Sequence, residues 1–522
     1  MKQDVIIKYI ADKFEAKKEG NVIVFNVPIE HITEICKKYY FEYKLQLKTI
    51  TATDERGAGN GFKIFYVFGA PGEHAFFIPY IVLKDTESFP SITKDIHGAS
   101  GYERKIKTFF GLEPVGHPQP RRVLLPDNWP DGIFPLRKDF HWQNRPASAN
   151  TPYEFQKVAG EGIYEIPVGP VHAGIIEPGH FRFSVAGEEI VLLEARLGYK
   201  HRGIEKLFEI LSLDNNVRLS ERVSGDTSFT HSLAFCQAVE TLADCEVPER
   251  ATYLRVVFSE LERLANHFND IGFIMLDAGY SFGGSNGARL RERVMQWNER
   301  LTGSRFLRGV NAIGGVTRDI SPTVRKELHD ELKRLQKDFT EVIEISEDSS
   351  SLLNRLQGTG KLDYQIALDH DIIGVAGRAI GLEHDARIEY PYAAYDKLRF
   401  AMALEKEGDV RSRLYVRIKE VNTSLSMLEQ ALEKMPADGK LRNAGDVTLR
   451  PDSHGIGIAE GWRGEILYFL VTDYAGGLTR VDVRDSSFIN WTVLGHSAKG
   501  NVVPDFPLIN KSFNLSYSGN DL

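Results

Sequence analysis

Cysteine is the residue type that most sharply limits the metal chemistry of this chain of 522 residues. The sequence contains three cysteines, Cys36, Cys236 and Cys245. No two of them form the C-x-x-C pattern, so neither a zinc site nor an iron–sulfur cluster can be built from this chain alone. The low, odd count favours a reducing compartment without structural disulfides.

Two distant segments have the frame of a metal-ligand motif but carry other residues at the ligand positions. They are ERVSGDTSFTHS, residues 221–232, and DFPLINKSFNLSYSGNDL, residues 505–522. Both closely resemble the large subunit of membrane-bound, energy-converting nickel–iron hydrogenases. That family has R-x-C-G-x-C followed by F-x-H-S in the first segment, and D-P-C-x-x-C in the second. Its four thiolate positions fall here on Ser224, Thr227, Ser516 and Gly519.

These substitutions predict that the nickel site has been lost. Nickel needs soft, anionic sulfur ligands, and a hydroxyl or a bare backbone cannot replace them. Nickel–iron large subunits also usually carry a C-terminal extension that is removed after nickel insertion, whereas this sequence stops three residues past Gly519. We therefore expect no metal in this chain.

Two charged residues occupy positions that serve the metal in the nickel–iron family. Glu205, in HRGIE, matches the glutamate that passes protons from the metal, and Arg463, in EGWRGE, matches the guanidinium over the metal's open face. Without a metal, Glu205 is either a proton relay or one half of an ion pair with Lys206 or a nearby arginine. Arg463 either binds an anion or forms a structural salt bridge, with Glu205 or Asp226 as its partner.

Two histidines match functional positions of related proteins. His180, in EPGHFRF, falls where complex I presents a histidine to the quinone head group, and it could donate a hydrogen bond or proton there. The tyrosine that partners this histidine in complex I falls on Phe229, so half of the quinone clamp is missing. His231, in FTHS, matches the histidine that faces the small subunit's iron–sulfur cluster in hydrogenases. It is equally compatible with an ordinary helix histidine at an interface.

The sequence predicts an α+β fold with two domains. Residues 1–140 form a small α/β domain, in which YKLQLKTITAT, FKIFYVFGA and AFFIPYIVL predict strands. Residues 141–160 lack apolar periodicity and contain two prolines, which indicates a linker. Residues 161–522 predict a large, mainly α-helical bundle with short β-sheets, because apolar side chains recur at helical spacing over long segments.

Each domain resembles one hydrophilic subunit of complex I. GYERKIKTFFGL with the following GHP, RRVLLP and PLRKD resembles the 30-kDa-type subunit, with Lys105 in place of the second glutamate of its E-R-E motif. From GPVHAGIIEPGHFRF through ELERLANHFNDIG to EGWRGE, the rest resembles the hydrogenase large subunit and the homologous 49-kDa-type subunit. A fusion of both in one chain is found in formate hydrogenlyase-type and hydrogenase-4-type subunits.

Composition limits the possible partners. The net charge of -8 and the absence of a long basic run argue against a nucleic-acid partner. The N-terminal MKQDVIIKYIADKFEAKK is too charged for a signal-peptide core, and the longest apolar stretches are far shorter than the ~18–20 residues that span a bilayer. Attachment to a membrane would therefore require partner subunits.

The resemblance implies a subunit of a membrane-bound, complex I-like, energy-converting oxidoreductase without a nickel–iron centre. Its expected partners are a small iron–sulfur subunit of the complex I 20-kDa type, a ferredoxin-like iron–sulfur subunit, and antiporter-like and anchor membrane subunits. We expect no cofactor in this chain, iron–sulfur clusters in the partners, and a peripheral position on the cytoplasmic side of the cell membrane. The alternatives are a subunit that reduces a quinone or another small acceptor, and a non-catalytic structural scaffold.

Overall fold

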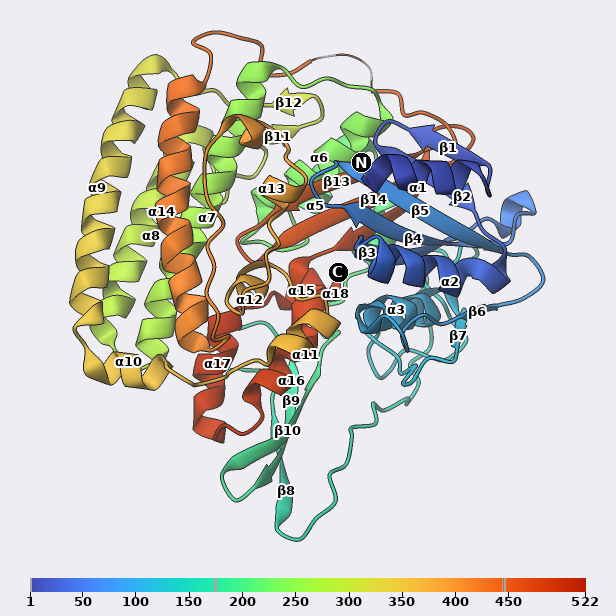
Figure 1. Cartoon of the computed structure of the whole chain (residues 1–522), viewed down its shortest axis with the longest axis horizontal. Helices are drawn as coiled ribbons and strands as arrows, with labels where there is room; N and C mark the ends of the chain where they lie inside the picture. Colours follow the sequence, from blue (N-terminus) through green and yellow to red (C-terminus); the bar gives the residue numbers. More distant parts are fainter. Residues whose placement is uncertain (1, 173–175, 444, 446) are drawn as a thin grey trace.

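The computed structural model describes residues 2–172, 176–443, 445 and 447–522. A small sheet-containing domain at the N-terminal end lies beside a long helical bundle, and a narrow sheet projects from the region between them (Figure 1). The predicted fold class, a small α/β domain followed by a mainly helical bundle with short sheets, is confirmed.

The first domain is built on a five-stranded sheet in the order β1-β2-β5-β4-β3. β2 and β5 are parallel, and the other neighbours are antiparallel. The three strands predicted from apolar runs are confirmed as β3, β4 and β5. The strand bounds are β1 (Ala16–Glu19), β2 (Val22–Asn26), β3 (Gln46–Asp54), β4 (Phe62–Ala70) and β5 (Ala75–Leu83), with a separate parallel pair, β6 (Ser88–Pro90) and β7 (Glu113–Val115).

Both faces of the central strands β4 and β5 are buried, which explains why these two strands are almost continuously apolar. On one face, Phe68 and Phe77 belong to an apolar core shared with three helices, α1 (Lys2–Ala11), α2 (Ile32–Lys37) and α3 (Ser100–Phe110). On the other face, Phe65 and Ile78 share an apolar cluster with Phe469 of the second domain. Apolar packing therefore forms part of the interface between the two domains.

Residues 141–160 contain no helix or strand, and most of their side chains are exposed, as a linker requires. Two hydrogen bonds hold the second half of this segment against the second domain. The Tyr153 hydroxyl donates to the Glu194 carboxylate at 2.6 Å, and the Gln156 amide donates to the same carboxylate at 2.8 Å. The exact domain boundaries stay a prediction.

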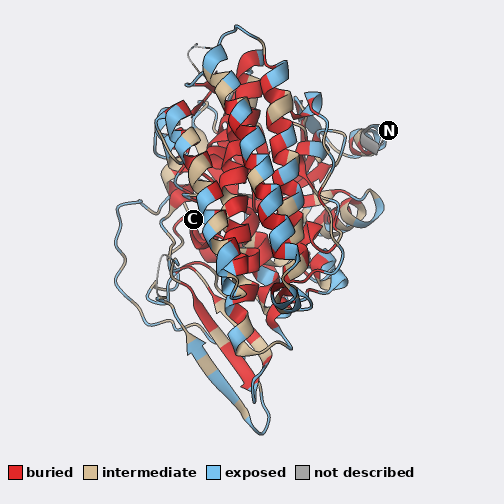
Figure 2. Ribbon diagram, turned by 90° about the vertical axis from the view of Figure 1, so that its left-hand side faces the viewer, coloured by how far each residue is buried: buried red, intermediate tan, exposed pale blue. Residues whose placement is uncertain are grey.

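The bundle of the second domain consists of four long helices, α7 (Glu249–Asp277), α8 (Ser281–Thr302), α9 (Pro322–Glu347) and α14 (Val410–Lys434). Figure 2 shows buried and exposed residues on different faces of these helices. Ser321 accepts a hydrogen bond from the Val324 amide and caps α9, with Pro322 in its first turn. α7 and α8 touch through glycines: a Cβ on Gly287 would lie 2.6 Å from the Cα of Gly272. The glycines of FGGSNGAR, residues 282–289, therefore allow close contact between the two helix backbones.

Two three-stranded antiparallel sheets complete the main framework. The projecting sheet, which follows the linker, has the order β10-β9-β8, and the other packs between the first domain and the bundle. Their strands are β8 (Ile163–Val168), β9 (His180–Ala186), β10 (Glu189–Arg196), β13 (His454–Glu460), β14 (Glu465–Thr472) and β15 (Leu478–Arg484), with a small pair, β11 (Asn311–Ala312) and β12 (Gly315–Val316).

Shorter helices fill the remaining connections. None of the helices in the described residues combines the length and apolar character that crossing a bilayer requires. Their bounds are α4 (Ile204–Phe208), α5 (Leu213–Ser220), α6 (Ser228–Leu242), α10 (Ser350–Leu356), α11 (Tyr364–Asp369), α12 (Gly374–Arg378), α13 (Ala386–Glu389), α15 (Ser486–Asn490), α16 (Leu494–Ala498), α17 (Phe506–Phe513) and α18 (Tyr517–Asp521).

Candidate functional site

The four thiolate positions are brought together from segments that lie almost 300 residues apart. Ser224 and Thr227 lie in the turn before α6, whereas Ser516 caps α18 and Gly519 lies in its first turn. The Ser224 and Ser516 hydroxyls hydrogen-bond at 2.9 Å, and the Gly519 amide donates to the Ser516 hydroxyl at 2.9 Å. We call these residues the hydroxyl cluster.

Arg463 closes the hydroxyl cluster from the turn between β13 and β14. Its two terminal nitrogens each donate to an Asp226 carboxylate oxygen at 2.8 Å, and one also donates to the Thr227 hydroxyl at 3.3 Å. Its guanidinium stacks 3.8 Å from the Trp462 ring centroid. Burial acts to raise the pKa of Asp226, but Arg463 outweighs it and the pKa falls to about 2. A salt bridge with Asp226 is therefore present, and its carboxylate is ionised at neutral pH.

Backbone contacts fix the turn that carries Arg463. Arg263 on α7 donates to the carbonyl oxygens of Glu460 and Gly461, at 2.6 and 3.0 Å. Gly374 and Gly464 approach so closely that a Cβ on Gly374 would lie 2.5 Å from the Cα of Gly464. Because Gly374 has φ of +65° and contacts backbone, only glycine fits there without strain.

His231 lies in the interior beside the hydroxyl cluster. It is fully buried, with Nε2 at 3.0 Å from Asp485 Oδ2 and Nδ1 at 3.1 Å from the Tyr468 hydroxyl. Burial acts to raise the pKa of Asp485, but His231, the charge of Arg463 and the Ser487 amide together leave that pKa below its ordinary value. The same carboxyl fills the space at Gly519, where a Cβ would lie 2.6 Å from the Asp485 carboxyl carbon. The proposed orientation of His231 toward a partner's cluster stays a prediction.

Glu205 lies at the junction of the two domains. Its carboxylate accepts hydrogen bonds from Lys105 Nζ at 2.8 Å, Arg480 Nη2 at 3.1 Å and the Val483 amide at 2.9 Å. Of the two alternatives for Glu205, the ion pair with a nearby arginine is thus present. Lys206 instead donates to the Arg137 carbonyl oxygen at 3.0 Å.

Lys105 explains the one departure from the E-R-E motif. Its ammonium group lies 2.8 Å from Glu205 and 3.1 Å from Asp482, and all three side chains are buried. A glutamate at position 105 would place three carboxylates together, whereas Lys105 offsets one of the two negative charges of Glu205 and Asp482. Burial acts to raise the pKa of Asp482, but Lys105 and Arg480 lower it to about 2.

His180 lies apart from the other predicted catalytic residues, at the start of β9. Its Nδ1 lies 3.2 Å from the Gly169 carbonyl oxygen, and its ring packs 5.2 Å from that of Phe155. Within the described part of the chain, no hydrogen bond or ion pair joins it to Glu205 or Arg463. These three residues therefore do not form a directly connected catalytic group.

Phe229, at the position of the quinone-clamp tyrosine, is fully buried and packs against Phe258 with ring centroids 5.8 Å apart. A fully buried phenylalanine offers no polar contact to a ligand. The structure thus contains no hydroxyl at this position to pair with His180.

Glu262 is a buried carboxylate that motif comparison did not single out. It accepts hydrogen bonds from the amides of Phe229 and Thr230 at 2.7 and 3.1 Å, which caps the N-terminus of α6. Burial, with a smaller contribution from the charge of Asp226, raises the pKa of Glu262 to about 7. It lies four residues after Phe258, on the apolar stripe of α7. A carboxylate on such a stripe was the sequence signal that could have identified it.

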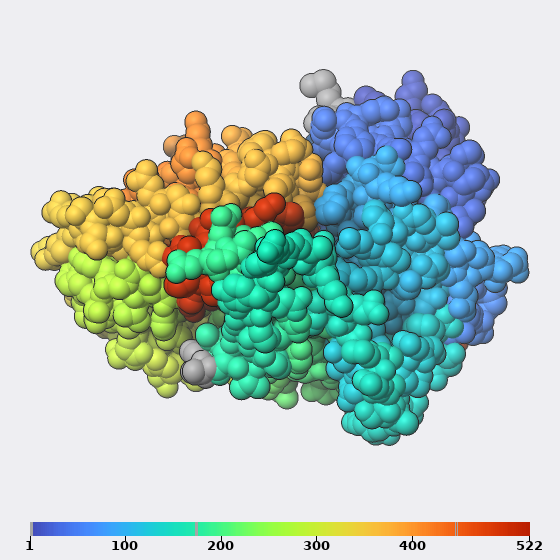
Figure 3. All heavy atoms as spheres, turned by 90° about the horizontal axis from the view of Figure 1, so that it is seen from below, coloured from blue at the N-terminus to red at the C-terminus, as the bar shows by residue number. Residues whose placement is uncertain are grey.

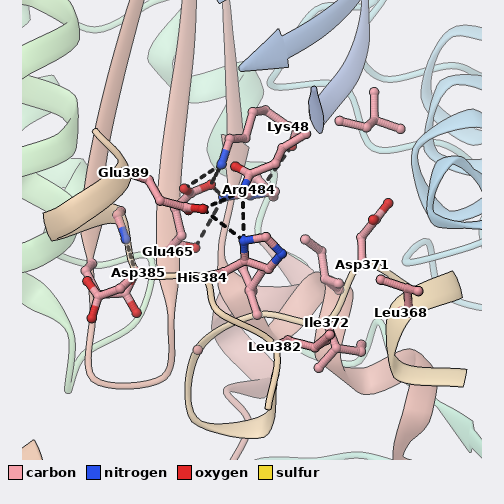
Figure 4. A pocket seen from close by; sticks show the side chains of 17 residues that line it. Lys48, Leu368, Asp371, Ile372, Leu382, His384, Asp385, Glu389, Glu465 and Arg484 are labelled. Carbon is pink, nitrogen blue, oxygen red and sulfur yellow. Dashed lines mark hydrogen bonds and ion pairs between the residues drawn. The ribbon is translucent and has the colours of Figure 1, made fainter. Parts of the chain in front are cut away.

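A cavity of ≈40 Å³, lined by both charged and apolar side chains, lies between the domains near the turn that carries Arg463 (Figure 4). Glu460 and Glu465, the residues that flank the turn, both line it. Lys48 reaches in from β3 and pairs with Glu465 at 2.7 Å, and Arg484 pairs with the same carboxylate. Charged side chains of both domains therefore lie next to one another at this cavity.

The described residues contain no group of three or more histidine, cysteine, aspartate or glutamate side chains arranged to hold a metal ion. The hydroxyl cluster offers three hydroxyl groups and a glycine, with the Asp226 carboxylate already engaged by Arg463.

Comparison with protein families gives two matches within the chain. Residues 25–146 match the 30 Kd subunit of the respiratory-chain NADH dehydrogenase, and residues 277–456 match its 49 Kd subunit. The two matches fall in the two domains of the fold, in the order expected from the sequence motifs.

Whole-chain similarity is found with two proteins of Escherichia coli K12. The chain is 35% identical to hydrogenase-4 component G over 97% of its own length and 89% of that protein, and 34% identical to formate hydrogenlyase subunit 5 over 96% and 89%. It also resembles a chain of the membrane-bound sulfane sulfur reductase, an archaeal respiratory membrane complex, with 26% identity and a TM-score of 0.65. That match covers 70% of this chain and all of the other.

Replacing Lys105 with methionine tests the charge cluster at the domain junction. Because Glu205 and Asp482 would lose a shared cation in a buried place, we expect a loss of about 3–5 kcal/mol in the free energy of unfolding. Urea unfolding followed by circular dichroism measures it. Lys107→Met is the matched control on the same helix, since Lys107 and its partner Glu113 are 35% and 49% exposed and the pair contributes about 1 kcal/mol at most. Equal effects of the two substitutions would contradict the assignment.

Replacing Asp371 with asparagine tests the cavity between the domains. Asp371 lines the cavity and accepts a hydrogen bond from the Tyr40 hydroxyl at 2.7 Å, and burial raises its pKa to about 6. The stability that its protonated form contributes is fully present below the unfolded pKa of 3.8 and is lost as the pH rises through 6. We therefore expect the melting temperature of the parent to fall relative to Asp371→Asn over this window. The exposed neighbour Asp369→Asn is the control; identical pH profiles for all three proteins would refute the idea.

Proposed function

Because the chain belongs to the family that includes hydrogenase-4 component G and formate hydrogenlyase subunit 5, in which 30 Kd-type and 49 Kd-type domains are fused, we propose that it is a subunit of a membrane-bound, complex I-like oxidoreductase. In this proposal it has no nickel–iron centre and takes part in electron transfer coupled to ion translocation. Iron–sulfur subunits deliver the electrons, and membrane subunits hold the chain on the cytoplasmic side. The likeness to a respiratory membrane complex supports this assignment.

The observation that carries the proposal is the 2.9 Å hydrogen bond between Ser224 and Ser516. It joins two positions that supply thiolates in the nickel–iron family, and neutral hydroxyls do not replace thiolates as nickel ligands. At Gly519 the Asp485 carboxyl occupies the space that a side chain would need. The residues present therefore do not fit a nickel–iron centre.

The hydroxyl cluster fits a polar or anionic acceptor better than a metal. Arg463 holds a guanidinium group at its edge, and the hydroxyls of Ser224 and Ser516 can donate or accept hydrogen bonds. Glu262 lies close enough to Asp226 for their charges to interact, and its pKa of about 7 allows it to hold or release a proton at neutral pH. The chain thus has a proton-exchanging group near the cluster that does not depend on Glu205.

A structural scaffold is the second candidate, and one observation favours it. Glu205, the residue matched to proton transfer, is held by two cations and a backbone amide. All of these donors come from the protein itself, so Glu205 acts here as part of the junction between the two domains. In this alternative the chain holds the iron–sulfur subunit on the membrane subunits without chemistry of its own.

Metal analysis tests the absence of nickel directly. We expect the purified complex to contain iron but no stoichiometric nickel by plasma mass spectrometry. A variant with cysteine at all four thiolate positions should also fail to bind nickel, because the Gly519→Cys side chain would meet Asp485. The triple variant without Gly519→Cys serves as its control for folding. One nickel per chain in the parent complex would overturn the proposal.

Arg463 variants separate chemistry from scaffolding. In the assembled complex we expect Arg463→Met to slow electron transfer about tenfold or more, because a fixed positive charge at the cluster is lost. Arg463→Lys, which keeps the charge, should retain more activity. Electron transfer and ion translocation are measured separately, with subunit composition as the assembly control. If Arg463→Met assembles and runs at the parent rate, the scaffold alternative is correct.

A further inference from the structure

A groove of ≈390 Å³ lies where α3 and the segment 121–124 of the first domain face β10 and α16 of the second. Seen from below, the first domain and the helical part of the chain lie on either side of the segment that contains β8 to β10 (Figure 3). This volume is in the range of small-molecule sites. Neither the hydroxyl cluster nor the proposed function uses it.

The charge of this groove is strongly one-sided. Five cationic side chains and one carboxylate line it. The carboxylate, Glu194, is already committed, because it accepts hydrogen bonds from Arg121 at 2.7 Å and from the Tyr153 hydroxyl at 2.6 Å. The cations are Arg104, Arg121, Arg122, Arg196 and Lys499.

Of the four arginines in this groove, Arg104 is the one without an anionic partner among the described residues. Its Nε donates to the Arg121 carbonyl oxygen at 2.9 Å, and within the described residues neither terminal nitrogen has a hydrogen bond or ion pair. Burial lowers the pKa of Arg104; Tyr153 and Glu194 act against this, whereas the nearby charges of Arg121 and Arg196 add to it. A half-buried guanidinium beside other cations is costly unless an anion joins it.

The walls of the groove supply apolar surface beside this charge. Leu193 and Trp491 are buried and line it, as does Phe488. One end reaches Asn520 of α18, and Trp491 Nε1 donates to the Ser516 carbonyl oxygen at 3.3 Å. The groove therefore extends to the back of the helix that carries two of the four thiolate positions.

We propose that this groove binds an amphipathic phosphate: the phosphate group lies on Arg104 and the apolar part lies along Leu193 and Trp491. A planar guanidinium with two free terminal nitrogens matches the geometry of a phosphate oxygen pair. Lys499 at the rim adds a second positive charge. The ligand is either a soluble organic phosphate or the headgroup of an anionic lipid, since both present the same chemistry.

Calorimetry on the purified full-length chain tests the proposal with two probes, inorganic phosphate and hexyl phosphate. We expect hexyl phosphate to bind at one site per chain and more tightly than inorganic phosphate. Arg104→Met should weaken its binding about tenfold or more, whereas Arg104→Lys should retain part of the affinity. Arg399→Met is the matched control, because Arg399 is exposed on the second domain away from the groove. A circular dichroism spectrum and melting curve establish that each variant is folded.

Sedimentation with vesicles then identifies the source of the phosphate. Vesicles of phosphatidylglycerol that pellet the parent but not Arg104→Met would identify a lipid headgroup, whereas hexyl phosphate binding without vesicle binding would identify a soluble ligand. Both results support the site. Equal affinity for the two phosphates, or an Arg104→Met variant that binds hexyl phosphate like the parent, would overturn it.

Discussion

The ammonium group of Lys105 is the charge on which the junction of the two domains depends. It comes from the first domain and lies between two buried carboxylates of the second, Glu205 on α4 and Asp482 on β15. Arg480 adds the second cation, so that two negative charges face two positive charges in a place that water does not reach. With either cation removed, the carboxylates would repel each other in a medium of low dielectric constant.

This charge cluster also sets the position of the hydroxyl cluster. The Val483 amide donates to Glu205, so the end of β15 is fixed directly by the junction. Two residues further on, Asp485 pairs with His231 and fills the space at Gly519. The charge cluster around Lys105 therefore fixes the end of β15. The backbone from Val483 to Asp485 connects this end directly to the place where the four thiolate positions meet.

The hydroxyl cluster is compatible with a stable fold in a way that four thiolates are not. Four thiolates at this spacing would repel one another unless a metal neutralised them, which makes their folding depend on metal binding. Two serine hydroxyls satisfy each other by donating and accepting, and Ser516 also accepts the Gly519 amide. Serine hydroxyls in place of cysteine thiolates thus allow these two segments to pack without a metal.

Sequence alone predicted the strands and the pairing of the two motif segments, because continuous apolar runs and family spacing are local signals. It did not predict the partners of Glu205, which lie 100 residues before it and 275 residues after it. These ion pairs depend on how the two domains pack together. The only sign of them in the sequence was Lys105 in place of the second glutamate of the E-R-E motif. Glu262 was missed because its role is set by burial against the α6 terminus rather than by any motif.

The distribution of buried charge suggests where a proton can be exchanged. Glu205 and Asp226 each pair with a cation at short distance, and the pKa of Asp226 is lowered to about 2. Burial raises the pKa of Glu262 to about 7, and it also raises to about 7 the pKa of Glu460, although Glu460 pairs with Arg378 at 2.8 Å. Glu460 begins the turn that carries Arg463, and Glu262 lies beside Asp226, the partner of Arg463. If an electron reaches the hydroxyl cluster, these carboxyls can balance its charge with a proton at neutral pH, whereas Glu205 is already neutralised by its two cations. The carboxyls with a pKa near neutral thus lie beside Asp226 and the turn that carries Arg463, whereas the position matched to the proton-transferring glutamate lies at the domain junction.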